Sequence, residues 1–318
     1  MQLKELVFSD IYVGQSDSWL SGVPLKGDPV PTPLEAAEDL LSLRDACEAL
    51  HKKKNRSEFN IKHDGIAYRA SALFSLDEVV YVLRRFPSQV PPLPHIGLHS
   101  QITNLLMTPK LTGMIIVAGA FGQGKTTTAS SLVSSRLSQF GGVCVGIEDP
   151  PEMPLQGRHG EGVCYQTEVE QGEFSGACRL AARWAPSIIF LGEIRDSETA
   201  AEALRASING RLVICTIHAD NIILAIERLF SLATGAAGSA EDVSSLMSNG
   251  LACVLHQRLE GEPRRPRAGF LWLKGDDTHG ARNLIKLRKW GQLGSEINLQ
   301  ANRMFSTMAA RVKSSGGF

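Results

Sequence analysis

Apolar runs alternate with amphipathic stretches through most of the chain after residue 95. Four runs rich in valine, isoleucine and leucine predict buried strands at residues 113–118, 143–147, 188–192 and 212–216. Apolar residues at helical spacing predict helices at 125–139, 173–184, 197–208, 220–232 and 239–250, and mostly helical structure is expected beyond residue 260. This alternation predicts an α/β domain in which helices cover both faces of a parallel sheet.

The first 86 residues follow a different pattern, in which short strands and helices are mixed. The predicted elements are short strands at 6–8 and 11–13, a helix from residue 32 or 33 to about Lys54, a strand pair across 60–71 that turns at Asp64-Gly65, and a helix from Leu76 to Arg85. This mixture predicts a smaller α+β domain ahead of the parallel sheet.

A proline-rich segment separates the two patterns. Pro87, Pro91, Pro92 and Pro94 stand within eight residues, and proline, which lacks an N–H group, is excluded from helix interiors and central strands. We therefore expect a linker at 87–95 between an N-terminal domain at 1–86 and a second domain at 96–318. Since proline-rich linkers are semi-rigid, the domains are expected to be held apart yet able to swing.

The overall composition argues against several classes of protein. The 33 lysines and arginines balance the 33 aspartates and glutamates, so no net charge favours nucleic acid or an acidic membrane, and stable nucleic-acid binding is not expected. The apolar runs are shorter than the roughly 20 residues that a membrane-spanning helix needs. The first residues lack the apolar core of a signal peptide, so a cytoplasmic protein is expected.

The six cysteines indicate neither a zinc module nor a disulfide framework. They form no C-x-x-C pair, the usual spacing of structural zinc ligands. Cys144 and Cys215 lie inside apolar runs, so we expect them to be buried free thiols.

Residues 119–126 carry the pattern G-x-x-x-x-G-K-[ST], which binds the phosphates of a nucleoside triphosphate. The pattern lies between a predicted strand and a predicted helix, where backbone N–H groups and the helix N-terminus face the phosphates. The Thr126 hydroxyl is also expected to bind Mg²⁺. The predicted nucleotide-binding residues here are Gly119, Gly122, Gln123, Gly124, Lys125, Thr126 and Thr127, and the predicted ligands are ATP and Mg²⁺.

Acidic residues follow the next two predicted strands. Glu148, Asp149 and Glu152 come after the strand at 143–147, and any of them could serve as a general base. Glu193 follows the strand at 188–192, as the Walker B carboxylate that holds Mg²⁺ does. The next acid, Asp196, fits a helix cap as well as a functional site.

The fourth predicted strand ends in Thr216-Ile217-His218, where a histidine could contact phosphate or a neighbouring subunit or could be structural. Taken in order, the motifs resemble those of the secretion and pilus ATPases. These have the phosphate loop, an Asp box of form I-E-D-P-x-E, a Walker B of form G-E-x-R-D and a His box of form T-x-H. The matching segments here are 119–126, 147–152, 192–196 and 216–218.

The resemblance implies a fold and a set of site residues. It implies a RecA-like ATPase domain preceded by a smaller PAS-like domain. Glu152 is implied as the catalytic base, Glu193 as the residue that coordinates or orients Mg²⁺, and His218 as a residue at the nucleotide or the subunit interface. Arg69 and Arg84 stand where family members carry N-terminal arginines, and we expect both to contact phosphate.

The resemblance also implies partners. Family members are ring motors, so the chain is expected to form a homo-oligomer, a hexamer, that binds an inner-membrane platform protein at the cytoplasmic face. The missing zinc module and residues 281–285 point to motors of the PilT, DotB or TraJ kind, and pilus retraction, type IV or IVB secretion and conjugation all stay open. Departures such as Arg211, where a histidine is usual, also leave open an ATP-gated docking subunit with little turnover.

Overall fold

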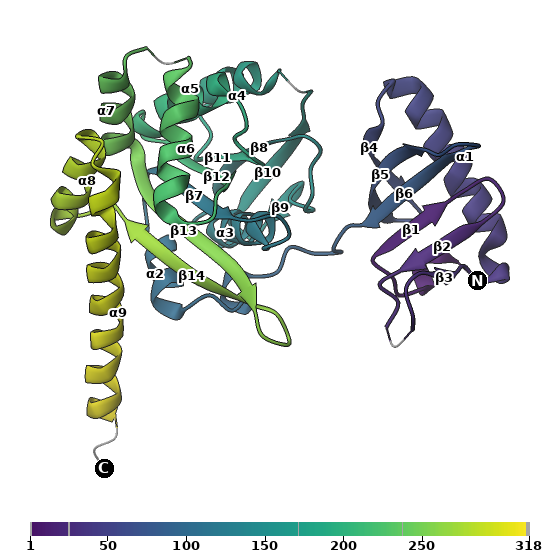
Figure 1. The fold of residues 1–318 in the computed structure, drawn as a ribbon, viewed down its shortest axis with the longest axis horizontal. Helices are drawn as coiled ribbons and strands as arrows, with labels where there is room; N and C mark the ends of the chain where they lie inside the picture. Colours follow the sequence, from purple (N-terminus) through teal and green to yellow (C-terminus); the bar gives the residue numbers. More distant parts are fainter. Residues whose placement is uncertain (1, 25, 171, 237, 316–318) are drawn as a thin grey trace. The chain divides into compact units, whose positions relative to one another are not determined.

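Two units with separate cores make up the chain in the computed structural model, which describes residues 2–24, 26–170, 172–236 and 238–315, with side chains up to residue 304. The N-terminal unit comprises the residues up to Gln89 together with a short loop, Pro150–Pro154. The parallel-sheet unit comprises the described residues of Val90–Asp149 and those from Leu155 onward. Figure 1 labels the elements of each unit.

The N-terminal unit is an antiparallel sheet covered by one long helix. The six strands follow the order β3-β2-β1-β6-β5-β4, and α1 supplies Leu43 and Cys47 to a core that also contains Phe59, Tyr68 and Leu83. The elements are the 3-10 turns η1 (Leu3–Glu5) and η2 (Leu34–Ala36), α1 (Ala37–Lys54), and the strands β1 (Asp10–Val13), β2 (Ser18–Ser21), β3 (Val30–Pro31), β4 (Glu58–His63), β5 (Ile66–Phe74) and β6 (Val79–Arg85).

The predicted strand pair and the first predicted helix are confirmed. Strands β4 and β5 pair in antiparallel register around Asp64 and Gly65, whose φ angles are +47° and +83°. Positive φ at both turn positions is what a two-residue hairpin loop requires, and it explains the Asp-Gly sequence there. The chain enters the helix through η2, and α1 ends at Lys54, as predicted.

Two predictions for this unit are wrong. Residues 6–8 follow the turn η1 and form no strand. The helix predicted at 76–85 is instead strand β6, which pairs with both β1 and β5. Its β-branched and aromatic residues suit a strand, and the side chains of Tyr81 and Leu83 are buried in alternation with more exposed neighbours. Tertiary pairing therefore decided against the helix.

The parallel-sheet unit is built on eight strands in the order β14-β13-β7-β12-β11-β8-β10-β9. All neighbours from β13 to β10 are parallel, and β14 and β9 add antiparallel edges. The strands are β7 (Gly113–Gly119), β8 (Gly142–Glu148), β9 (Gly157–His159), β10 (Gly162–Glu168), β11 (Ile188–Leu191), β12 (Leu212–His218), β13 (Leu251–Glu260) and β14 (Arg265–Trp272).

Helices cover both faces of this sheet, and each face has its own hydrophobic core (Figure 1). One core is completed by α2 (Ser100–Leu106) and α3 (Lys125–Phe140) after the turn η3 (Leu93–His95). The other is completed by α4 (Phe174–Arg183), α5 (Ser197–Ile208), α6 (Ile222–Thr234), α7 (Ala240–Gly250), α8 (His279–Lys286) and the start of α9 (Leu293–Ser315), with short turns η4 (Asp276–Thr278) and η5 (Trp290–Gln292) beside α8.

The four predicted strands and the five predicted helices of this unit are confirmed, with ends displaced by no more than two residues. Strands β9, β10, β13 and β14 were not predicted. The mostly helical structure expected beyond residue 260 is confirmed by η4, α8, η5 and α9, and β14 precedes them over the basic segment. Charged residues at the start of β14 suit its place at the edge of the sheet, where pairing with another chain must be avoided. Cys144 and Cys215 are buried free thiols, as expected. In the described ranges, no helix is both long enough and apolar enough to cross a bilayer.

Candidate nucleotide-binding site

The phosphate-loop sequence forms the predicted strand, loop and helix. Strand β7 is buried along its whole length, and the loop after it enters α3 at Lys125. Gly124 precedes the helix with φ +73°, a left-handed conformation that glycine adopts without steric cost. The N–H groups at the start of α3 lack partners within the helix, so this end of the helix is suited to bind phosphate.

Two glutamines fix the loop against β13. The side-chain Nε2 of Gln257 donates to the backbone carbonyl of Gln123 at 2.6 Å, and the side-chain Oε1 of Gln123 accepts from the backbone N–H of Leu259 at 2.7 Å. A Cβ atom at Gly119 would lie 2.5 Å from the Gln257 carbonyl oxygen, so the backbones approach closely there. Gln257 was missed because β13 was not predicted. Gln123, predicted to bind the nucleotide, directs its side chain to β13.

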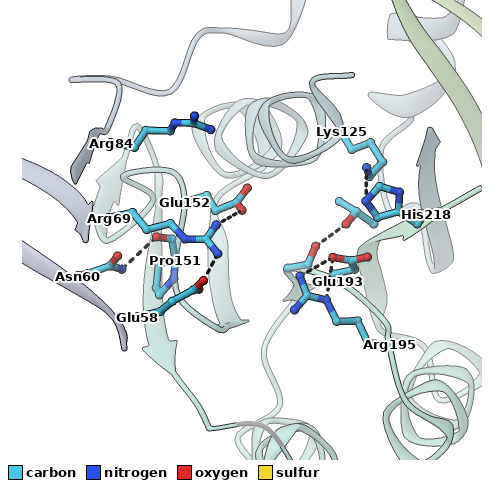
Figure 2. Close-up of polar contacts among 12 residues, drawn as sticks. Glu58, Asn60, Arg69, Arg84, Lys125, Pro151, Glu152, Glu193, Arg195 and His218 are labelled. Carbon is cyan, nitrogen blue, oxygen red and sulfur yellow. Dashed lines mark hydrogen bonds and ion pairs between the residues drawn. The ribbon is translucent and has the colours of Figure 1, made fainter. Parts of the chain in front are cut away.

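Lys125, at the start of α3, meets His218, at the end of β12. His218 ends β12 opposite Gly119 of β7, and its Nε2 lies 3.4 Å from the Lys125 Nζ, which also donates to the Ala120 carbonyl at 2.9 Å (Figure 2). Burial and the positive charge of Lys125 lower the pKa of His218, and the carboxylate of Glu193 opposes them. The imidazole is therefore neutral at neutral pH.

The Walker B segment lies on the next strand. Glu193 follows β11, and Arg195 contacts its Oε2 through Nε at 2.9 Å and Nη2 at 2.8 Å. Thr216 of β12 donates its hydroxyl to the Gly192 carbonyl at 2.5 Å, which ties this turn to the neighbouring strand. The interpretation of Asp196 as a helix cap is confirmed, because its carboxylate accepts from the Thr199 N–H at the start of α5.

Glu148 is a buried carboxylate beneath the Walker B turn. It ends β8, is only 1% exposed, and its Oε1 accepts from the Gln166 side chain at 2.7 Å. Gln166 and Gln156 also exchange hydrogen bonds between their side chains and backbone N–H groups, which fixes the chain just after the Asp box. Glu148, the last residue of β8, thus supports the neighbouring turn from inside the sheet.

The N-terminal unit places the two predicted arginines side by side. The register of β4, β5 and β6 sets Asn60, Arg69 and Arg84 opposite one another, so their side chains share one face of the sheet. Arg84 pairs through Nε with Asp10 of β1 at 2.7 Å.

The same face holds the end of the Asp box, which belongs to this unit. Arg69 pairs with Glu152 at 3.0 Å through Nη1 and with Glu58 at 2.9 Å through Nη2, and Asn60 donates to the Pro151 carbonyl at 3.0 Å (Figure 2). Glu152, the predicted base, is thus in direct contact with Arg69, which was predicted to bind phosphate. Glu58 had no motif to mark it in the sequence.

The structure therefore assembles the predicted residues in two groups. Gly119, Gly122 and Gly124 shape the phosphate loop, and Lys125, Thr126 and Thr127 begin α3. Glu193 and His218 belong with them in the parallel-sheet unit, whereas Arg69, Arg84 and Glu152 lie in the N-terminal unit.

Comparisons with known proteins agree with this architecture. A family model described as "Type II/IV secretion system protein" matches residues 40–264. The type IV pilus retraction ATPase PilT of Pseudomonas aeruginosa is 30% identical over 245 residues, which are 76% of this chain and 69% of PilT. The uncharacterized protein YggR of Escherichia coli is 29% identical over 307 residues, covering 92% and 91% of the two chains.

A solved structure of the pilus retraction motor PilT, with bound ADP, superimposes with a TM-score of 0.75 at 28% sequence identity. The match covers 94% of this chain and 90% of that chain, so both the antiparallel N-terminal sheet and the mostly parallel sheet have counterparts there. The family match spans more than half of the sequence and includes the phosphate loop and both acidic motifs. The chain is therefore a member of the type II/IV secretion system protein family, and it is a nucleotide-binding ATP hydrolase.

Proposed function

We propose that the chain is a Mg²⁺-dependent ATPase that works as a homo-oligomeric ring, a hexamer, and powers a type IV pilus or a type IV or IVB secretion or conjugation machine. One observation carries the proposal: Lys125, His218 and Glu193 gather at the carboxyl ends of the adjacent strands β7, β12 and β11. Ligands bind at this edge of open α/β sheets.

The residues of the phosphate loop would bind and orient the triphosphate. Lys125 is only 8% exposed, so its charge acts in a poorly hydrated setting, where an ion pair with phosphate is strong. The ammonium and the loop N–H groups would stabilise negative charge that builds on the γ-phosphoryl oxygens. His218 would stay neutral and hold the Lys125 side chain at the end of β12.

The residues present also fit Mg²⁺. Thr126 supplies a hydroxyl in the first turn of α3, and Glu193 supplies a carboxylate at the end of β11. Mg²⁺ prefers such oxygen ligands together with phosphate oxygens and water. When bound, the ion would neutralise charge on the β- and γ-phosphates, while Arg195 holds the Glu193 carboxylate in place.

Glu152 is proposed as the base that accepts a proton from the attacking water, and Arg69 and Arg84 as phosphate-contacting arginines. A planar guanidinium can bind two phosphate oxygens at once. For this work Arg69 must exchange its present carboxylate partners, Glu152 and Glu58, for phosphate. Exchange of one anionic partner for another would free the base at the moment when the nucleotide is engaged.

The Arg69–Glu152 ion pair also favours a second candidate function. If the pair persists when nucleotide binds, base and arginine both stay occupied, and the chain would act as an ATP-gated docking subunit with little turnover. In either case we propose attachment to an inner-membrane platform protein at the cytoplasmic face. The balanced charge of the chain speaks against stable nucleic-acid binding.

Turnover of Mg²⁺-ATP, measured per chain over a range of protein concentrations with the mass of the same samples, tests the ring. We expect turnover to rise as the oligomer forms, because sites shared between copies need assembly. Constant turnover from a monomer would rule out the ring, and bound ATP without turnover would select the docking subunit.

Point variants test the site. Lys125→Ala should abolish turnover, and Glu152→Gln should bind ATP but hydrolyse it at least about tenfold more slowly. Glu58→Gln is the matched control, because it removes the other carboxylate that contacts Arg69 and lies outside the Asp box. Equal losses in the two glutamine variants would mean that Glu152 only positions Arg69.

A further inference from the structure

Phe121 is the residue of the phosphate loop whose side chain neither the motif nor the core explains. It occupies a variable position of the G-x-x-x-x-G-K-[ST] pattern, and its side chain is 81% exposed. A phenyl group on the surface of a loop gains little from burial, so folding alone gives no reason for it. Any purpose must come from what the ring contacts.

The Phe121 ring lies against the imidazole of His218. The two ring centroids are 6.1 Å apart and the ring planes differ by 4°, an offset parallel arrangement within the usual range for interacting aromatic pairs. His218 stands opposite Gly119 in the β12–β7 register, so the loop that carries Phe121 begins beside it. Phe121 therefore lies parallel to the imidazole and is displaced sideways from it.

Lys125 contacts the edge of the same imidazole. An ammonium group can only donate hydrogen bonds, so the His218 Nε2, 3.4 Å from Nζ, must be the acceptor. The contact thus requires a neutral imidazole with its proton on Nδ1 and its plane turned toward Lys125. The same ammonium donates to the carbonyl of Ala120, the residue just before Phe121.

We propose that Phe121 is a positioning residue that fixes the plane of the His218 imidazole so that Nε2 faces Lys125. This inference deepens the proposed function, since it rests on the place of His218 in the nucleotide site. In this arrangement Phe121 of the loop contacts the imidazole on one side, and Lys125, the first residue of α3, contacts its edge. The orientation of His218 then depends on the conformation of the loop, and the loop couples nucleotide binding to the end of β12.

The charged surroundings of His218 set the direction of the test. Burial lowers its pKa, Lys125 of α3 adds to this effect, Glu193 after β11 opposes it, and Arg228 of α6 and Arg195 lower it further. Removal of the Phe121 ring gives water more access to the imidazole from that side and leaves these charges in place. The pKa of His218 should therefore rise in Phe121→Ala and return to the parent value in Phe121→Tyr, which keeps the ring.

A double-mutant cycle on the full chain tests whether Phe121 acts through His218. We expect Phe121→Ala to lower kcat about threefold to tenfold with little change in KM for ATP, the loss that an aromatic pair of ordinary strength would give. In the His218→Gln background the same change should have no further effect. Trp184→Ala is the matched control, since it removes another largely exposed aromatic ring, at the C-cap of α4, and should leave kcat unchanged.

Two results would overturn the proposal. An equal loss of kcat in both backgrounds would show that Phe121 acts without His218, and a rise confined to KM would show that it contacts the nucleotide. The His218 titration, followed by NMR of the imidazole, needs no turnover. If the parent protein proves inactive, an unchanged His218 pKa in Phe121→Ala still refutes the proposed contact between Phe121 and His218. A raised His218 pKa in Phe121→Ala that returns to the parent value in Phe121→Tyr still supports the contact.

Discussion

Replacement of Gln257 with leucine tests whether β13 holds the phosphate loop in its binding conformation. The side chain is 1% exposed, its Nε2 donates to the Gln123 carbonyl at 2.6 Å, and its Oε1 is buried with no hydrogen-bond partner among the described residues. Leucine has a similar volume and removes both polar atoms. The variant therefore separates the bond to the loop from the packing of the core.

The effect on the free energy of unfolding is the difference of two terms. Loss of the hydrogen bond costs about 0.5–1.5 kcal/mol, and removal of the unpartnered buried acceptor relieves about 1–3 kcal/mol. These terms oppose each other, so the free energy of unfolding should fall by no more than about 0.5 kcal/mol and could rise by up to about 2.5 kcal/mol. Of its two described hydrogen bonds with β13, in contrast, the loop keeps the one from Leu259 to Gln123. Because ATP must then order a looser loop, its binding free energy should be less favourable by about 0.5–1.5 kcal/mol. This corresponds to a Kd for ATP that is roughly twofold to tenfold higher.

Titration calorimetry with ATP and urea unfolding measure the two quantities in the same samples. Gln300→Leu is the matched control, because the Gln300 amide bonds the backbone of Trp272 on β14 at 2.7 and 2.9 Å and does not contact the loop. The control should lose stability and keep its affinity for ATP. A Gln257→Leu variant with unchanged Kd would refute the idea that this glutamine positions the loop.

Three further predictions concern Gly192, two cysteines and His218 of the parallel-sheet unit. Gly192→Ala should lower turnover, and it should lower the free energy of unfolding by about 1–3 kcal/mol, because the new Cβ would lie 3.0 Å from Cγ of buried Glu148. A melting temperature equal to that of the parent protein would contradict this. Burial raises the pKa of the Cys144 and Cys215 thiols, so a thiol reagent should label them only after unfolding, and rapid labelling of the native protein would be inconsistent. The lowered pKa of His218 means that its stabilising contribution is complete above the unfolded pKa of about 6.5 and is lost as the pH falls through the folded pKa. Urea unfolding at about pH 7.5 and pH 5.5 should therefore show a smaller difference between parent and His218→Gln at the lower pH, and a constant difference argues against it.

The sequence by itself determined the elements whose signals are local. Strand β7, the phosphate loop and α3 follow from one continuous segment, because a buried parallel strand reads as an apolar run and the loop has a fixed pattern before a helix. The cap of α5 at Asp196 and the turn at Asp64-Gly65 are equally local. Glu193 and His218 could be located because Glu193 lies just after such a strand and His218 ends one.

Local patterns failed where two structures fit the same residues. The spacing of Leu76, Val79, Val80 and Leu83 suits a helix, yet the segment is also rich in β-branched residues. Pairing with β1 on one side and β5 on the other satisfies its backbone as strand β6. Such pairing depends on residues far away in the chain, so periodicity within the segment could not decide between them.

Only the tertiary structure determined which side chains meet. The bond from Gln257 to Gln123 spans 134 positions, and the ion pair from Arg69 to Glu152 spans 83. Neither contact has a local signature, because a hydrogen bond or an ion pair depends on a separation in space that the topology of the sheets sets. Sequence motifs thus identify the residues suited to bind phosphate, and the fold decides which partners hold them.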